Sequence, residues 1–269
     1  MTTSGLCRLS GLSRQAYYQG RRQRQRKARA NAQILEVVHR ERLEMPRIGT
    51  RKLQGVLGKA GLMVGRDYLF ELLGENDLLV APKKKSVRTT YYDQALPVYR
   101  NRLYDWEPTL PHQLWVSDLT FIDTDEGFLY LSLITDRVSR CIVGWNAADS
   151  ALASESIKAL KMAIDQLPAG CWPIHHSDRG SQYCCHEYVA VLNERGLPIS
   201  MTEQNHCYEN CYAERVNGIL KDEFNLDHKF RTRAQARRAI AQAITTYNTR
   251  RPHLSLQMRT PNEVHHLTA

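Results

Sequence analysis

Residues 206–224 read HCYENCYAERVNGILKDEF, and the rest of the sequence can be organised around this stretch. At 100° per residue it predicts one amphipathic helix with an apolar and a polar face. The apolar face, which must pack on another element, has Val216, Ile219, Leu220 and Phe224. The polar face has Asn210, Glu214, Asn217 and Lys221. Glu214 and Lys221 lie two turns apart and point the same way, either as a solvated surface pair or as part of a functional site.

Positive charge is concentrated in the first third of the chain. The chain has 269 residues, of which 42% are hydrophobic, enough for one large core or for one core and a small domain. Residues 1–100 carry 20 Lys and Arg against 8 Asp and Glu, whereas residues 101–269 carry 17 against 20. This asymmetry favours a polyanion that docks on the first part, although a merely soluble basic surface has the same composition.

Several classes of protein are disfavoured by simple features of the sequence. Residues 1–20 lack the apolar core of a signal peptide, and no run of about 18 apolar residues occurs, so we expect a cytoplasmic protein with no membrane span. The seven cysteines include no Cys-x-x-Cys pair, which leaves a structural zinc site poorly supported. Reduced thiols and ordinary histidines are the simpler interpretation.

Residues 1–29 predict a partial helix-turn-helix followed by a basic linker. Residues 6–19 have two short helical patterns separated by a Ser-Gly break, and Ser13 is a plausible N-cap of the second. Residues 21–29, RRQRQRKAR, have no apolar periodicity, so we expect a flexible or helical linker that contacts phosphate.

Residues 30–80 predict a helix-turn-helix DNA-binding domain. The apolar pattern indicates helices over residues 31–45, 51–59 and 66–75, with Thr50 as the cap of the second helix and Gly61 at its end. Three short helices with a glycine turn before the last favour DNA binding over an ordinary helical lobe. The basic side chains that would face the duplex backbone are Arg51, Lys52, Lys59 and Arg66.

Residues 111–269 predict an α/β domain, which a polar, proline-punctuated linker over residues 81–110 joins to the helical region. LWVSDLTFI, residues 114–122, alternates with period two, so Val116, Asp118 and Thr120 share one face of a strand. Further strands are expected over residues 128–135, 139–147, 172–176 and 197–201, and helices over 154–167 and 183–195. An antiparallel meander followed by alternating helices and strands predicts a mixed five-stranded sheet flanked by helices.

Three carboxylates fall where such a sheet would place a site. Asp118 lies in the middle of the first strand, where an ionised carboxylate requires a cation or hydrogen-bond donors. Asp178 directly follows the fourth strand, and Glu214 lies on a helix that can pack across the same edge. Carboxylates without a soft ligand favour Mg²⁺ or Mn²⁺, and two such ions about 4 Å apart support phosphoryl transfer. The competing carboxylates, all in predicted turns and expected to be structural, are Asp123, Asp125, Asp136 and Asp149.

Five blocks of this sequence resemble, in order and spacing, those of retroviral integrases and bacterial insertion-sequence transposases. They are WVSDLTFI (115–122), LITDRVSRCIVGW (133–145), HHSDRGSQY (175–183), AERVNGILKDEF (213–224) and YNTRRPHLSLQMRTPNEV (247–264). The 35 residues between Asp178 and Glu214 resemble the DD(35)E signature of these enzymes. The resemblance spans about residues 6–264 and is nearest to the second-reading-frame (OrfB) transposases of two-frame insertion sequences.

This resemblance implies an RNase H-like integrase core over residues 111–269, with a C-terminal helical extension, in which two Mg²⁺ ions bind Asp118, Asp178 and Glu214. It also implies that Lys221 contacts DNA near the transferred end. The implied partners are the terminal inverted repeats of the element, target DNA, further copies of the chain and a first-frame (OrfA) protein.

Two departures from the family pattern stand out. Glu209-Asn210 replaces the usual Asp-Asn before the glutamate helix, a change that conserves charge. The His-His-Cys-Cys zinc module that precedes the core of retroviral integrases is missing, which favours the bacterial branch.

The expected reaction has a hydrolytic step that frees a 3′-OH and a transfer step in which this hydroxyl attacks a second phosphodiester. Neither step requires a covalent protein–DNA intermediate. The side chains expected to position phosphates are Arg179, Ser181, Gln182, Asn210 and Lys221, although Ser181 and Gln182 can equally form the turn of their own loop. The alternatives are an RNase H-like nuclease or resolvase, and a DNA-binding repressor with an inactive core.

Overall fold

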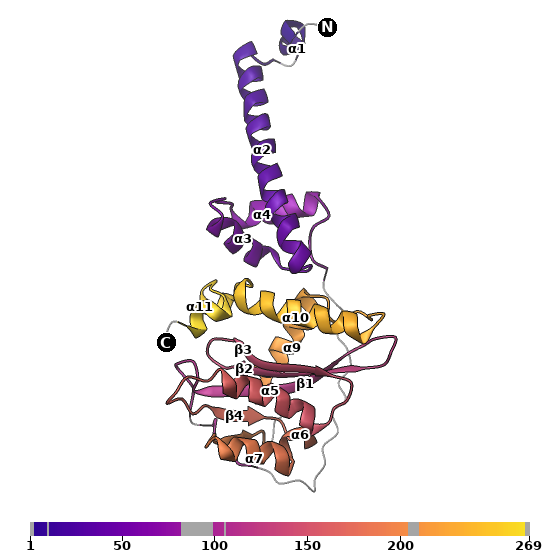
Figure 1. Ribbon diagram of the computed structural model, residues 1–269. Coiled ribbons are helices and arrows are strands. Elements are labelled where there is room, and N and C mark those ends of the chain that lie inside the picture. The colour runs from indigo at the N-terminus through magenta and orange to yellow at the C-terminus, as the bar shows by residue number, and fades with distance from the viewer. Residues whose placement is uncertain (1–2, 10, 82–98, 105, 204–209, 267–269) are drawn as a thin grey trace. The chain divides into compact units, whose positions relative to one another are not determined.

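A computed structural model describes residues 3–9, 11–81, 99–104, 106–203 and 210–266 (Figure 1). The chain divides into two compact units, one of residues 1–43 and 48–80 and the other of residues 44–47 and 81–269. No helix in these described ranges has the length and apolar character needed to cross a bilayer.

The first unit is helical. Its helices are α1 (Thr3–Leu9), α2 (Arg14–Glu44), α3 (Thr50–Lys59) and α4 (Arg66–Glu75). Ser13 Oγ accepts a hydrogen bond from the backbone N of Ala16 at 3.0 Å, which confirms the predicted N-cap. The basic run at residues 21–29 is helical and continuous with the helix predicted over 31–45. Arg, Gln, Lys and Ala are good helix formers, so the missing apolar periodicity does not end the helix.

Buried aliphatic side chains from three helices form the core of this unit. The buried side chains include Val38 of α2, Leu53 and Leu57 of α3, and Leu69 and Leu73 of α4. The end predicted for α3 is correct, because Gly61 has φ +79° and the backbone N of Leu62 donates to the Leu57 carbonyl at 2.8 Å. The cap predicted at Thr50 is wrong: Thr50 is the first residue of α3, and Gly49 occupies the N-cap position.

The second unit is built on one five-stranded sheet. Its strands are β1 (Leu114–Ile122), β2 (Leu129–Asp136), β3 (Ile142–Ala148), β4 (Ile174–Ser177) and β5 (Ile199–Met201). The strand order is β3-β2-β1-β4-β5, with antiparallel pairs among the first three strands and parallel pairing of β4 with β1 and β5. The mixed five-stranded sheet predicted from the sequence is therefore confirmed.

Helices cover both faces of this sheet (Figure 1). They are α5 (Ala153–Asp165), α6 (Ser181–Cys184), α7 (His186–Glu194), α9 (Cys211–Glu223), α10 (Arg233–Thr249) and α11 (Pro261–His265). Trp115 packs with α5 and α7 on one face, whereas Leu114 and Val116 pack with Ala213 of α9 on the other. One helix was expected over residues 183–195, but the extended backbone of Cys185 divides this stretch into α6 and α7.

Two close packing contacts fix elements of this unit. A Cβ added at Gly144 of β3 would lie 2.2 Å from the Ala159 carbonyl oxygen, so only glycine lets α5 approach the sheet this closely. Arg251 is 2% exposed, and its guanidinium binds both carboxylate oxygens of Glu223 at 2.9 and 2.7 Å. This ion pair joins the chain after α10 to the end of α9.

Part of the predicted linker lies along the sheet. Residues 82–98 of that linker fall outside the described residues. The backbone N of Asn101 donates to Glu203 Oε1 at 2.6 Å, and the backbone N of Arg102 donates to Ser200 Oγ at 3.0 Å. The chain from residue 99 therefore belongs to the second unit.

Candidate active site

Strand pairing brings the first two predicted carboxylates together. In the parallel pair of β1 and β4, Ser117 is opposite Ser177, so Asp118 on β1 lies next to Asp178, the first residue after β4. The α9 helix crosses β1 at this level, because Asn210 Nδ2 donates to the Ser117 carbonyl at 3.0 Å. Ala213 packs on Leu114 and Val116, which brings its neighbour Glu214 to the same region of the sheet.

Asp118 is the centre of this group. Its Oδ2 accepts a hydrogen bond from Asn217 Nδ2 at 2.8 Å, and its Oδ1 accepts one from the backbone N of Leu119 at 2.9 Å. Burial and then the charge of Asp178 raise the pKa of Asp118 to about 7, with a smaller contribution from Glu214, against the two hydrogen bonds. Three carboxylates thus interact electrostatically in a partly buried place, an arrangement that a bound cation would stabilise.

Asp178 is held by the turn that follows β4. Its Oδ1 accepts a hydrogen bond from the backbone N of Gly180 at 3.0 Å. The Arg179 guanidinium donates to the Thr202 carbonyl at 2.6 Å and the Glu203 carbonyl at 2.9 Å, which ties this turn to the chain after β5. Ser181 is exposed at the start of α6, and Gln182 is partly buried.

Asn210 has a different environment from the one expected. Its side chain is 2% exposed, and its amide is bound to the Ser117 carbonyl. Asn210 therefore holds the start of α9 on β1, whereas the phosphate contact predicted for it would require this side chain to be exposed. Glu209, which replaces the aspartate of the usual Asp-Asn pair before the glutamate helix, lies outside the described residues.

Asn217 was missed as a site residue by the sequence-based prediction. It is buried on the face of α9 that meets β1, and it donates directly to Asp118. Its position three residues after Glu214, on the predicted polar face, was the available signal.

Lys221 lies one further turn along α9. Its Nζ is 4.7 Å from the centroid of the Phe121 ring, and this ring contacts that of Phe128 with centroids 4.9 Å apart. Burial lowers the pKa of Lys221, whereas the charges of Asp118 and Asp227 raise it. The ammonium group therefore shares the electrostatic environment of Asp118.

The basic residues predicted to contact DNA in the first unit lie on α3 and α4. Arg51 and Lys59 are exposed on α3, and Lys52 is partly buried there. Arg66 is exposed at the start of α4, where its Nε lies 2.7 Å from Asp67 Oδ1.

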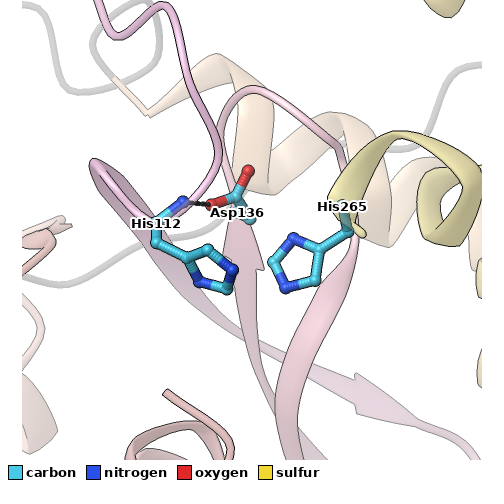
Figure 2. Close-up of side chains that lie close together, drawn as sticks. All are labelled: His112, Asp136 and His265. Carbon is cyan, nitrogen blue, oxygen red and sulfur yellow. Dashed lines mark hydrogen bonds between the residues drawn. The ribbon is translucent and has the colours of Figure 1, made fainter. Parts of the chain in front are cut away.

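A second group of possible metal ligands lies away from these carboxylates. Figure 2 shows His112, Asp136 and His265, whose candidate ligand atoms all lie within 4.8 Å of one another. Asp136 Oδ2 accepts from the backbone N of His112 at 2.8 Å, and Oδ1 accepts from Val138 N, Ser139 N and Ser139 Oγ. The Ser139 hydroxyl is also 2.9 Å from His265 Nδ1. These hydrogen bonds satisfy Asp136 without a cation and confirm its predicted structural role.

Comparisons with known proteins agree with this architecture. Two family models described as integrase core domain match residues 108–207 and 195–261. A 31 kDa protein of insertion element IS600 from Shigella sonnei is 36% identical over 262 residues, which cover 93% of this chain and 94% of that protein. The transposase for insertion sequence element IS629 from the same organism is 32% identical over 204 residues, or 76% of this chain and 68% of that protein.

A solved structure has the same fold. It is the intasome of simian T-cell lymphotropic virus in complex with PP2A regulatory subunit B56 gamma, with a TM-score of 0.51 and 18% identity. The alignment covers 81% of this chain and 71% of that chain. The second unit is thus an RNase H-like core of the integrase type.

Proposed function

Because the chain belongs to the insertion-sequence transposases that carry an integrase core domain, we propose that it cuts DNA at the ends of an insertion sequence and joins the freed 3′ ends to target DNA. The observation that carries this proposal is the placement of Asp118 on β1 beside the turn of Asp178 and the helix of Glu214. Burial and the neighbouring carboxylates raise the pKa of Asp118 to about 7. Clustered carboxylates at the edge of a sheet are costly unless they bind cations.

Asp118, Asp178 and Glu214 fit a pair of hard divalent cations, Mg²⁺ with Mn²⁺ as a substitute, because their donors are all carboxylate oxygens. When bound, such ions activate an attacking oxygen and stabilise a leaving oxygen in phosphoryl transfer. Asn217 holds Asp118 in one rotamer through the 2.8 Å hydrogen bond. Gly180 does the same for Asp178 through its backbone N.

Lys221 suits a role in binding the phosphate next to the reacting one. Its ammonium is half-buried and lies on the face of α9 that carries Glu214 and Asn217. An anion there would compensate for the burial that lowers the pKa of Lys221. Ser181 and Gln182, at the start of α6, are further candidates for contacts with the backbone of the DNA.

The first unit is proposed to bind the terminal inverted repeats of the element. Arg51, Lys52 and Arg66 are its candidate phosphate contacts, on two helices separated by a glycine turn. Joining two DNA ends to one target requires two active sites, so we propose that the chain acts as a homo-oligomer on DNA. A first-frame protein, free or fused, is a further proposed partner.

The test uses labelled DNA that ends in the terminal repeat of the element, incubated with the full chain in Mg²⁺ or in EDTA. We expect cleaved and joined products in Mg²⁺ alone, which disappear in Glu214→Gln and persist in Glu194→Gln, an exposed glutamate at the end of α7. A fusion to the first-frame protein is assayed in parallel. Cleavage without joining would indicate a nuclease, and binding without either reaction would indicate a repressor.

A further inference from the structure

A cleft lies beside the carboxylates, on the face of β1 that meets α9. Its volume is about 250 Å³, and its apolar floor is formed by Leu103, Leu114 and Val116. Val116 precedes Asp118 by two residues on the same face of β1, which corresponds to roughly 7 Å along the strand. Tyr212, also in the lining, precedes Glu214 by two residues on α9. The cleft therefore lies on the same face of β1 as Asp118, although none of the three carboxylates lines it.

Aromatic side chains form the walls of this cleft. Tyr104 and Trp106 line it together with Tyr212, and they are 57% and 38% exposed. Large aromatic faces that remain in water beside an apolar floor indicate a surface that is completed by a ligand. A planar ligand suits such walls, because aromatic rings stack favourably on any base of a nucleic acid.

Two arginines at the end of the cleft supply positive charge. The guanidinium carbons of Arg137 and Arg140 lie 3.2 and 4.2 Å from the centroid of the same Tyr212 ring. Burial and then the charge of Arg140 lower the pKa of Arg137, and Glu107, the nearby acid, is an exposed partner at 3.5 Å. Two half-buried cations on one ring favour a phosphate, which guanidinium groups bind with good geometry.

We propose that this cleft binds one unpaired nucleotide of the DNA substrate, with its base against Trp106 and its phosphate on Arg137 and Arg140, the two guanidinium groups that Tyr212 holds. This inference rests on the proposed function, because the reacting phosphodiester supplies the DNA beside the cleft. The nucleotide must be unpaired, since the face of a base inside a duplex is covered by its neighbours. The cavity is smaller than the roughly 300–1,000 Å³ of sites for drug-sized ligands, which suits a single base.

Binding is measured in EDTA with the full chain, so that the result does not depend on cleavage. The two probes are terminal-repeat duplexes of equal length, one fully paired and one with its last nucleotides unpaired and a 2-aminopurine among them. Trp106→Leu should bind the unpaired probe about ten-fold more weakly, as expected for the loss of one stacked base, and the paired probe equally well. It should also lose the quenching of 2-aminopurine that the unchanged protein produces.

Matched variants separate this site from general DNA affinity. Trp172→Leu removes a tryptophan that is 64% exposed and absent from the lining, and it should leave both probes unaffected. Arg140→Gln should weaken binding of the unpaired probe, whereas Arg195→Gln, at an exposed arginine after α7, should not. Equal affinity of Trp106→Leu and unchanged protein for the unpaired probe would overturn the inference.

The unchanged protein distinguishes this failure from failure of the proposed function. If the unchanged protein joins DNA ends in Mg²⁺ while Trp106→Leu keeps its affinity for the unpaired probe, the proposed function stands and only the nucleotide-binding role of the cleft is contradicted. If the unchanged protein binds neither probe, the proposed function fails, and the cleft with it. Equal melting temperatures of Trp106→Leu and the unchanged protein would confirm that the variant is folded.

Discussion

Asn217 Nδ2 on α9 donates a hydrogen bond of 2.8 Å to Asp118 Oδ2 on β1. The two residues are 99 positions apart in the chain, and their contact joins the helix of Glu214 to the strand of Asp118. Because this hydrogen bond favours the ionised carboxylate, it lowers the pKa of Asp118 against burial. The contact orients a proposed metal ligand and also sets its charge.

Asn217→Ala should therefore reduce the rate of strand joining by about 10–100-fold, the usual cost of losing a partner that orients a metal ligand. Its pH–rate profile should move to higher pH, because the pKa of Asp118 rises when the donor is lost. Joining rates measured from pH 6 to 9, with Asn193→Ala on the exposed side of α7 as control, test this. An unshifted profile would limit Asn217 to a packing role.

The stability of the metal-free protein should depend on the ionisation of Asp118. Its folded pKa of about 7 lies above the ordinary value of 3.8 for an aspartate, so the folded state binds an extra proton between these two pH values. Stability then falls as the pH rises through this window. Asp118→Asn should raise the Tm in EDTA at pH 8, because it removes the unfavourable free energy of the ionised, buried carboxylate. The expected gain is roughly 2–4 °C for each kcal/mol removed, and at pH 4 the substitution should have little effect.

Mg²⁺ provides the matching control for that measurement. It should raise the Tm of the unchanged protein at pH 8 and leave that of Asp118→Asn nearly constant, because ligand binding stabilises only a protein that retains the site. A Tm for Asp118→Asn that follows the unchanged protein at every pH and Mg²⁺ concentration would contradict both the electrostatic strain and the metal assignment.

The Glu223–Arg251 ion pair should matter to the second unit mainly when it is broken on one side. Arg251→Met leaves a buried carboxylate unpaired and should cost about 3–5 kcal/mol in the free energy of unfolding. Adding Glu223→Gln should recover much of that loss. Lys158→Met, which breaks an exposed pair with Glu155, should cost less than about 1 kcal/mol in the same urea titration. A double variant no better than Arg251→Met would contradict this account.

Arg51→Ala should weaken binding of the terminal repeat and reduce the slope of log affinity against log salt by about one, the value for one phosphate contact. Arg51 is exposed on α3 of the first unit, whereas Arg195 is exposed on the surface of the second unit. Arg195→Ala therefore provides the control. Affinity measured between 50 and 300 mM salt gives the slope. A slope unchanged by Arg51→Ala would remove this residue from the interface with DNA.

Most of the sheet could be predicted because its signals are local. The period of two in residues 114–122 gave the bounds of β1 directly, and the turns around Asp123 and Asp136 fixed the antiparallel order that follows. Errors arose where local signals compete. The basic run at residues 21–29 is helical because its residues favour a helix, and the predicted helix over 183–195 breaks at Cys185.

The sequence by itself determined the mixed sheet and the strand of Asp118, and it predicted one site for Asp118, Asp178 and Glu214 from strand ends, helix faces and the resemblance to transposases. Only the tertiary structure decided that Asn217 binds Asp118, that Asn210 is buried with its amide on the Ser117 carbonyl, and that Trp106 borders the same face of β1. The physical reason is that sequence patterns report interactions between residues close in the chain, and not contacts between distant elements. Periodicity fixes which way a side chain points within its own element, whereas its partner and its burial depend on which distant element packs there.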